Sequence, residues 1–87
     1  MSDFLIQDNI LMKYTGLDSN VVIPEDVTQI GSWAFTDNTN ITSIVIPGSV
    51  TTIMNHAFSG CTQLKEISIP QSVKVIKDGV FYRCSAP

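Results

Sequence analysis

The sequence predicts a mostly β solenoid, a chain wound into three short stacked coils, and three observations predict it. Pro24, Pro47 and Pro70 are spaced 23 residues apart. Each of them stands in the same apolar pattern, I-P-x-x-V-x-x-I-x-x-x-A-F, in which only one position changes, to Val80 in the third copy. A 23-residue period lies within the range of about 20–29 residues of repeats that supply one strand and one returning segment per coil. One coil cannot bury its own apolar side chains, so coils with matching side chains are expected to stack in register.

Residues 1–20 precede the repeats and predict a β-hairpin cap. Apolar side chains alternate on both sides of a turn at Asp8-Asn9: Phe4, Ile6, Ile10, Met12 and Tyr14. Aspartate and asparagine both tolerate the positive φ that a tight hairpin turn requires. We expect this hairpin to cover the open N-terminal edge of the sheet, which would otherwise present unpaired backbone groups.

Residues 21–87 form the repeats, and each coil is expected to contain two extended segments. In Ile44-Val45-Ile46 and Ile67-Ser68-Ile69 the outer residues share one face and the middle residue points away. The proline that follows has no N–H for the ladder and ends the pairing. The valine and isoleucine after it predict a second, short extended segment that points inward. The Ala-Phe pair then fills the remaining corner, where the ring covers about 150–250 Å² of apolar surface.

The third repeat is incomplete, because the sequence ends shortly after Phe81. Apolar residues of this last coil are expected to form a bare end beside an open strand edge: Ile67, Ile69, Val73, Ile76 and Phe81. Solenoids need a polar cap at each end for solubility. Either the chain is a fragment of a longer array, or it forms a homo-oligomer through this exposed C-terminal coil.

The composition excludes several classes of function. The 87 residues make one small domain, 44% hydrophobic, with 5 Lys and Arg against 8 Asp and Glu and a net charge of -3. Nucleic-acid binding needs clustered basic residues, so no nucleic-acid partner is expected. No apolar run approaches the roughly 18–20 residues that cross a bilayer, so no membrane insertion is expected. The start, Met1-Ser2-Asp3, lacks the features of a signal peptide, so either a leader was removed or the protein stays where it is made.

The repeats resemble the BspA-like leucine-rich repeat of the Treponema pallidum type. The resemblance covers residues 21–87 and rests on the proline-centred pattern together with S-G-C-T-Q-L-K-E-I at residues 59–67. It implies the α/β leucine-rich-repeat class, here mostly β, as a right-handed coil with a parallel sheet on its concave side. The segment before the repeats resembles the short hairpin that often precedes the first repeat in this family. Family members are mostly bacterial cell-surface or secreted proteins implicated in adhesion, which implies an extracellular location; without a leader, the cytoplasm remains the alternative.

The two cysteines and the single histidine do not predict a catalytic site or a metal site. Cys61 and Cys84 occupy the repeat position that Asn38 takes in the first copy, a place that is typically Asn or Cys in leucine-rich repeats. We expect a structural role there, with a disulfide between coils as the alternative if the Cα atoms come within about 7 Å. Two thiols and His56 are too few ligands for a metal site. His56 is expected to face solvent or to be partly packed, and no catalytic residue, metal or cofactor is predicted.

The outward positions of the predicted strands form the candidate binding surface, to which we add the single tryptophan. Counting outward along the strands gives three stacked pairs, Asn20 and Val22, Ser43 and Val45, and Glu66 and Ser68, with Trp33 beside the alanine column. Apart from Glu66 these residues are uncharged, which suits a protein or glycan ligand better than a phosphate. Trp33 is a candidate anchor because exposed aromatic residues often serve as anchors in interfaces.

Together these observations predict a non-enzymatic protein- or glycan-binding module of an adhesion-type bacterial surface protein. The alternative is a purely structural cap or spacer that positions another domain, or that associates with itself through its open C-terminal end. An enzyme would need titratable groups that converge in a pocket, whereas the repeat pattern uses most of the apolar residues for core columns. The pattern does not identify the ligand.

Overall fold

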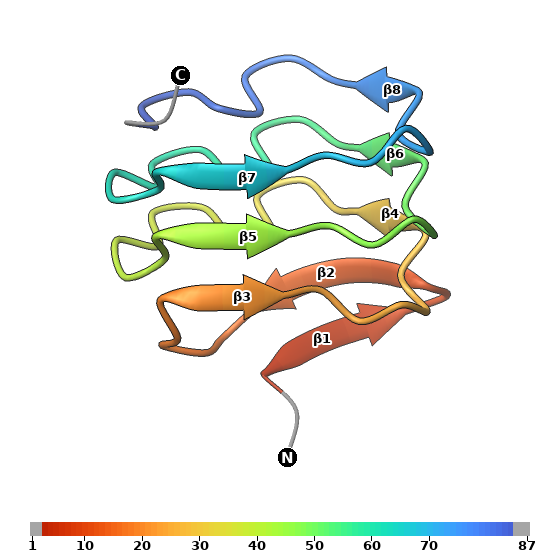
Figure 1. The fold of residues 1–87 in the computed structure, drawn as a ribbon, viewed down its shortest axis with the longest axis horizontal. Coiled ribbons are helices and arrows are strands. Elements are labelled where there is room, and N and C mark those ends of the chain that lie inside the picture. Colours follow the sequence, from red (N-terminus) through yellow and green to blue (C-terminus); the bar gives the residue numbers. More distant parts are fainter. Residues whose placement is uncertain (1–2, 85–87) are drawn as a thin grey trace.

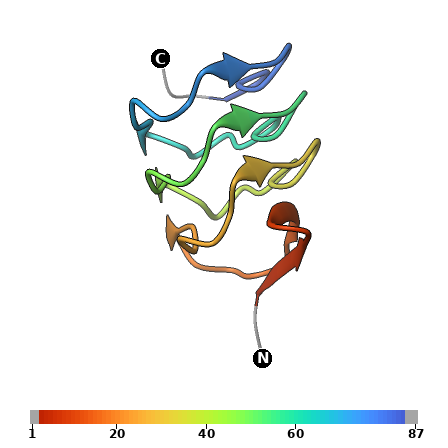
Figure 2. The ribbon, with the colours of Figure 1, turned by 90° about the vertical axis from the view of Figure 1, so that its right-hand side faces the viewer.

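The computed structural model describes residues 3–84, which form eight β-strands and no helix. The strands in chain order are β1 (Phe4–Gln7), β2 (Ile10–Tyr14), β3 (Asn20–Val22), β4 (Gln29–Ile30), β5 (Ser43–Val45), β6 (Thr52–Ile53), β7 (Glu66–Ser68) and β8 (Val75–Ile76). They form two sheets along opposite sides of a right-handed coil that rises from the hairpin to β8 (Figures 1 and 2). One sheet has the order β3-β5-β7 and the other β1-β2-β4-β6-β8.

The coils stack at the 23-residue spacing that the prolines predict. In the three-stranded sheet Val21 lies opposite Ile44 and Ile44 opposite Ile67, always in parallel pairs. In the other sheet Ile30 lies opposite Ile53, which lies opposite Ile76. The second extended segment of each coil is therefore a strand of its own, so the solenoid has two parallel ladders rather than one.

The hairpin is present, but it caps a different sheet from the expected one. β1 and β2 pair antiparallel around Asp8 and Asn9, whose φ values are 53° and 64°. β2 then pairs in parallel with β4, so the hairpin extends the sheet of the short inward segments. β3 remains an edge strand of its own three-stranded sheet. The expectation that the hairpin covers the edge of the β3-β5-β7 sheet is wrong. The sequence did not reveal that the second extended segments of the coils form a ladder of their own, with which β2 pairs.

A bulge also changes which hairpin side chains point inward. Leu5 lies opposite Lys13 and Ile6 opposite Leu11, so Met12 is the extra residue of β2. An extra residue shifts the alternation of side chains by one place. Leu11 is therefore fully buried and Met12 is 43% exposed, which corrects the strict alternation expected for Met12.

An aromatic column runs through the core along the axis of the solenoid. The rings of Phe35 and Phe58 lie 5.2 Å apart and those of Phe58 and Phe81 5.8 Å apart, centroid to centroid. The hairpin extends this column, since Tyr14 lies 5.3 Å from Phe35 and Phe4 lies 5.1 Å from Tyr14. These separations are in the range that aromatic pairs prefer. The prediction that the three repeat phenylalanines align is confirmed.

The last coil exposes side chains that the earlier coils bury. Ile53 is fully buried, whereas its counterpart Ile76 is 49% exposed. Ile46 is 3% exposed and its counterpart Ile69 is 38% exposed. The predicted bare apolar end is present within the described residues, because no further coil covers this face.

Gly60 combines a positive φ with a close approach to the coil below. Its φ is +80°, and a Cβ atom there would lie 3.1 Å from both the Cα and the N of Asp37 in the coil below. A left-handed residue other than glycine costs about 1–2 kcal/mol before any clash. We expect Gly60→Ala to lower the free energy of unfolding by at least that amount in urea titrations. Gly48→Ala is the matched control, expected within about 0.5 kcal/mol of the parent chain, because a Cβ at Gly48 meets nothing within 4 Å; equal losses would contradict the assignment.

Candidate binding surface

Six of the seven predicted surface residues lie together on the outer face of β3-β5-β7. The strand register stacks Asn20, Ser43 and Glu66 in one column. The same register stacks Val22, Val45 and Ser68 in a second column. The middle residue of each strand points into the core, as alternation along a strand requires.

This face, which we call the outer strip, presents apolar patches flanked by hydrogen-bonding groups. Val22 is 67% exposed and Val45 is 46% exposed. The hydroxyl of Ser43 donates to Oδ1 of Asn20 at 2.6 Å, which links the first column across two strands. Glu66 is the only charged residue of the strip. The strip therefore suits uncharged ligands with both polar and apolar parts.

The Ser43–Asn20 bond is exposed, so it should contribute little to folding. We expect Ser43→Ala to change the free energy of unfolding by no more than about 0.5 kcal/mol, as surface substitutions usually do. Thermal melts of the two proteins test this expectation. A loss of several kcal/mol would mean that β5 presents its other face to solvent.

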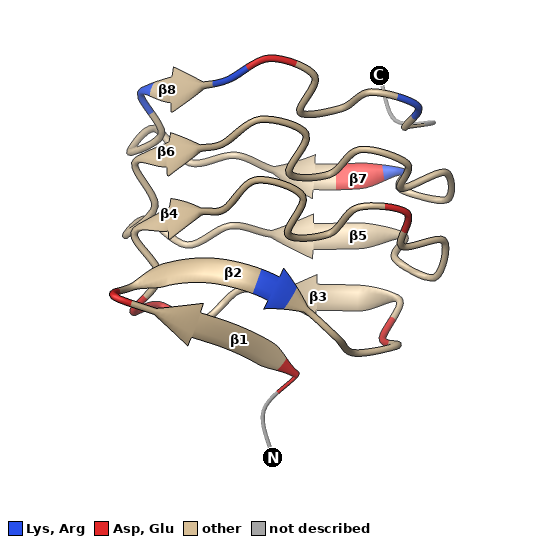
Figure 3. Cartoon of the chain, turned by 180° about the vertical axis from the view of Figure 1, so that it is seen from behind, with Lys and Arg blue, Asp and Glu red and all other residues tan. Residues whose placement is uncertain are grey.

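Trp33 is not part of the outer strip. It follows β4, in the segment that runs along the opposite side of the solenoid (Figures 1 and 3). Its φ is 64°, in the left-handed region, and 49% of its surface is exposed. Trp33 is therefore separate from the six strip residues, because the turn of the coil after β4 carries it to the far side, and its role as a binding anchor stays a prediction.

His56 packs against Trp33, a contact that the sequence analysis missed. The two rings are stacked, 4.3 Å apart and 4° from parallel. The ring of Tyr82 is nearly perpendicular to that of His56, at 88°, with the ring centroids 6.1 Å apart. Gly79 makes room for this ring, because a Cβ there would collide with the imidazole. The sequence signal that could have predicted this contact is that Trp33, His56 and Gly79 share one repeat position. Residues at one repeat position stack, and the glycine in the last copy leaves space above the histidine.

The family model described as the BspA-type leucine-rich repeat region (6 copies) matches residues 5–86. The chain belongs to the BspA-type leucine-rich repeat family. No match was found among curated proteins.

Three solved leucine-rich repeat structures resemble this chain. The leucine-rich repeat protein of T. pallidum is 27% identical with a TM-score of 0.85, over 92% of this chain and 42% of that protein. A leucine-rich cell surface protein of Faecalibacterium prausnitzii A2-165 is 28% identical with a TM-score of 0.78, over 97% and 27%. A leucine-rich repeat protein of Bacteroides ovatus is 25% identical with a TM-score of 0.65, over 90% and 28%. The chain thus spans less than half the length of each of these relatives.

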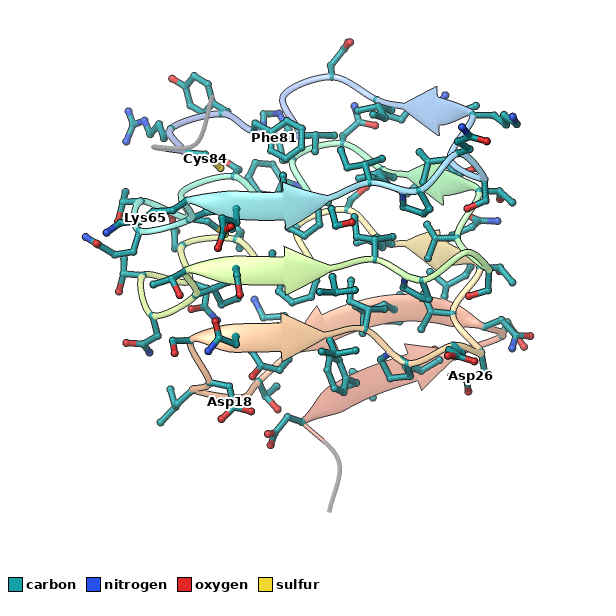
Figure 4. The ribbon with its side chains drawn as sticks, in the orientation of Figure 1. Asp18, Asp26, Lys65, Phe81 and Cys84 are labelled. Carbon is teal, nitrogen blue, oxygen red and sulfur yellow. The ribbon has the colours of Figure 1, made fainter. Side chains whose placement is uncertain are left out.

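In this leucine-rich repeat chain the cysteine column joins successive coils by hydrogen bonds. Cys61 Sγ donates to the carbonyl of Phe35 at 3.2 Å, and Cys84 Sγ donates to that of Phe58 at 2.9 Å (Figure 4 labels Cys84). Asn38, at the same repeat position, bonds within its own coil: its Oδ1 accepts the backbone N–H groups of Asn40 and Ile41. Below the coil that contains Asn38 lies the hairpin, whose β2 pairs with β4.

Both thiols are free and resist ionisation. Burial, followed by the neighbouring Cys84, raises the pKa of Cys61 to about 12. Burial also raises the pKa of Cys84. The thiolate is the form that attacks disulfides and binds metals, so burial disfavours the reactive form of both cysteines at neutral pH. Both are free in this structure, which does not contain the disulfide considered as the alternative.

The described residues contain neither a pocket nor a group of three metal-ligating side chains. Within the same residues, no helix has the length and hydrophobicity to cross a bilayer.

Proposed function

We propose that this chain is a non-enzymatic binding module of a bacterial cell-surface protein, and that the outer strip contacts a protein or glycan ligand. The chain belongs to the BspA-type leucine-rich repeat family, and one similar solved structure is named a cell surface protein. The strip supports the proposal most directly. It places exposed Val22 and Val45 beside hydrogen-bonding side chains on three strands in register.

The charges and dimensions of the strip favour weak, additive binding. With Glu66 as its single charged residue, it offers no cation to a phosphate group. Three strands at about 4.8 Å spacing span roughly 10–15 Å. A strip of this width is too small to supply the roughly 800 Å² per partner that a standard interface buries. Affinity would therefore come from many contacts along a longer face, with each coil contributing its outward pair of side chains.

An array of glycans and matrix proteins tests this proposal. We expect the chain to retain at least one ligand and Val45→Glu to weaken that binding by about tenfold or more, the loss of an interface anchor. Thr51→Glu is the matched control, because Thr51 is exposed beside the other sheet. Melting curves confirm that both variants fold. Equal binding by the two variants would place the contact elsewhere.

The rival proposal is a structural spacer or cap. It is favoured by the exposed apolar face of the last coil, which can seat another element of structure. If the chain melts cooperatively but binds no ligand on the array, that result would support the spacer and contradict the binding module.

A further inference from the structure

The charged residues of the chain are divided between its two ends. Between residues 3 and 26 there are five acidic side chains and one basic one, and between residues 65 and 84 there are four basic and two acidic. Only Asp37 lies between these segments. The hairpin end is therefore negative and the last coil is positive, as the coloured ribbon shows (Figure 3).

The backbone ladders run along the solenoid axis in columns that have a lysine at one end and an aspartate next to the residue at the other end. One hydrogen-bond column runs from Asn9, next to Asp8, through Thr28 and Thr51 to Lys74. Lys74 lies at the top of this column. If the molecule were repeated along its axis, the Asp8 of the next copy would therefore follow above Lys74.

A second column gives the same arrangement on the opposite side of the coil. It runs from Ser19, next to Asp18, through Thr42 to Lys65. Asp18 and Lys65 lie on the same side of the molecule, near the hairpin and in the last coil respectively (Figure 4). Arg83, in the last turn, adds a further positive charge to this coil.

Both ends also carry exposed apolar side chains and an edge strand. Ile76 is 49% exposed and Tyr82 is 55% exposed at one end, and Leu5 is 54% exposed and Leu17 is 80% exposed at the other. β8 and β1 are the two edges of the five-stranded sheet. Since β1 runs antiparallel to the other strands of its sheet, its edge could continue β8 as an antiparallel pair.

From this complementarity we propose that the last coil docks onto the hairpin end of a second copy of the chain, head to tail. Opposite charges then meet in both columns, whereas a symmetric contact between two last coils brings their lysines together. Because this contact repeats the molecule along the solenoid axis, it does not close into a ring, and association continues beyond the dimer into short filaments. The molecule measures 30 × 28 × 18 Å. The surface of either end is therefore small compared with the roughly 800 Å² per partner of a standard interface, so we expect weak association. Because the contact depends on exposed charges, we also expect it to be sensitive to salt.

Sedimentation equilibrium over a wide range of protein concentration tests the proposal. At low ionic strength the average mass is expected to rise past the dimer, and to return toward the monomer at about 1 M salt, where the Debye length is about 3 Å. A monomer throughout, an association that stops at the dimer, or one that salt strengthens would overturn the proposal.

Two double variants with the same change in net charge locate the contact. Asp8→Asn with Asp18→Asn neutralises the hairpin end and is expected to weaken association about 2- to 30-fold, the range for two exposed ion pairs. Glu66→Gln with Asp78→Asn neutralises two acids of the last coil and is expected to preserve or strengthen association. If net charge alone controlled association, both variants would behave alike, and that result would refute the head-to-tail contact.

Discussion

Replacing Phe58 by alanine is expected to lower the free energy of unfolding by about 3–5 kcal/mol, as truncation of a buried phenylalanine does. Phe58 is fully buried and stands in the middle of the aromatic column, between Phe35 and Phe81. Its removal leaves a cavity with rings above and below it, and the stacked coils cannot collapse into it without breaking two ladders. Urea denaturation followed by circular dichroism measures the loss.

The size of this loss matters because a small domain has about 5–15 kcal/mol of stability in total. Phe81→Ala is the matched control, since Phe81 is the same residue at the same repeat position but is only partly buried. We expect it to cost clearly less than Phe58→Ala. Equal costs would show that the last coil is covered in solution, which would also bear on the head-to-tail contact.

The repeat columns were predictable because they depend only on side-chain type at fixed spacing. A 23-residue period places Val21, Ile44 and Ile67 in one inward column, and the structure confirms it. The outer strip follows from the same count, because side chains alternate along a strand. Periodicity is therefore sufficient to predict where a side chain lies whenever the same residue type recurs at that repeat position in the coils above and below.

Features that interrupt the repeat were not predictable in this way. The bulge at Met12 depends on how β1 meets β2, and no second copy of the hairpin exists to show its register. The left-handed backbone at Trp33 was also hidden, because tryptophan does not normally mark a positive φ, although His56, at the same repeat position, is of a type that adopts it more often. Their stacked pair became visible only when the coil turn placed one repeat position above the next.

The cysteine column links packing to pH, and alkaline conditions are expected to destabilise the fold. Burial holds the pKa of Cys61 at about 12, against an ordinary value of 9.0. Between these values the unfolded chain releases the thiol proton while the folded chain retains it. The unfolded state then binds fewer protons, so stability falls as pH rises. Through Cys61 alone the loss reaches about 2 kcal/mol near pH 10.5.

Stability measured by urea denaturation from about pH 7 to about pH 10.5 tests this expectation, with Cys61→Ser as the matched variant. Serine can still donate to the carbonyl of Phe35, but it does not titrate in this range. The variant should therefore lose less stability with rising pH than the parent chain does. Some decline should remain, because burial also raises the pKa values of Tyr14 and Cys84. Parallel pH profiles for the two proteins would mean that Cys61 ionises in the folded chain as readily as in the unfolded one, and that its thiol is not sealed between Phe35 and the coil above.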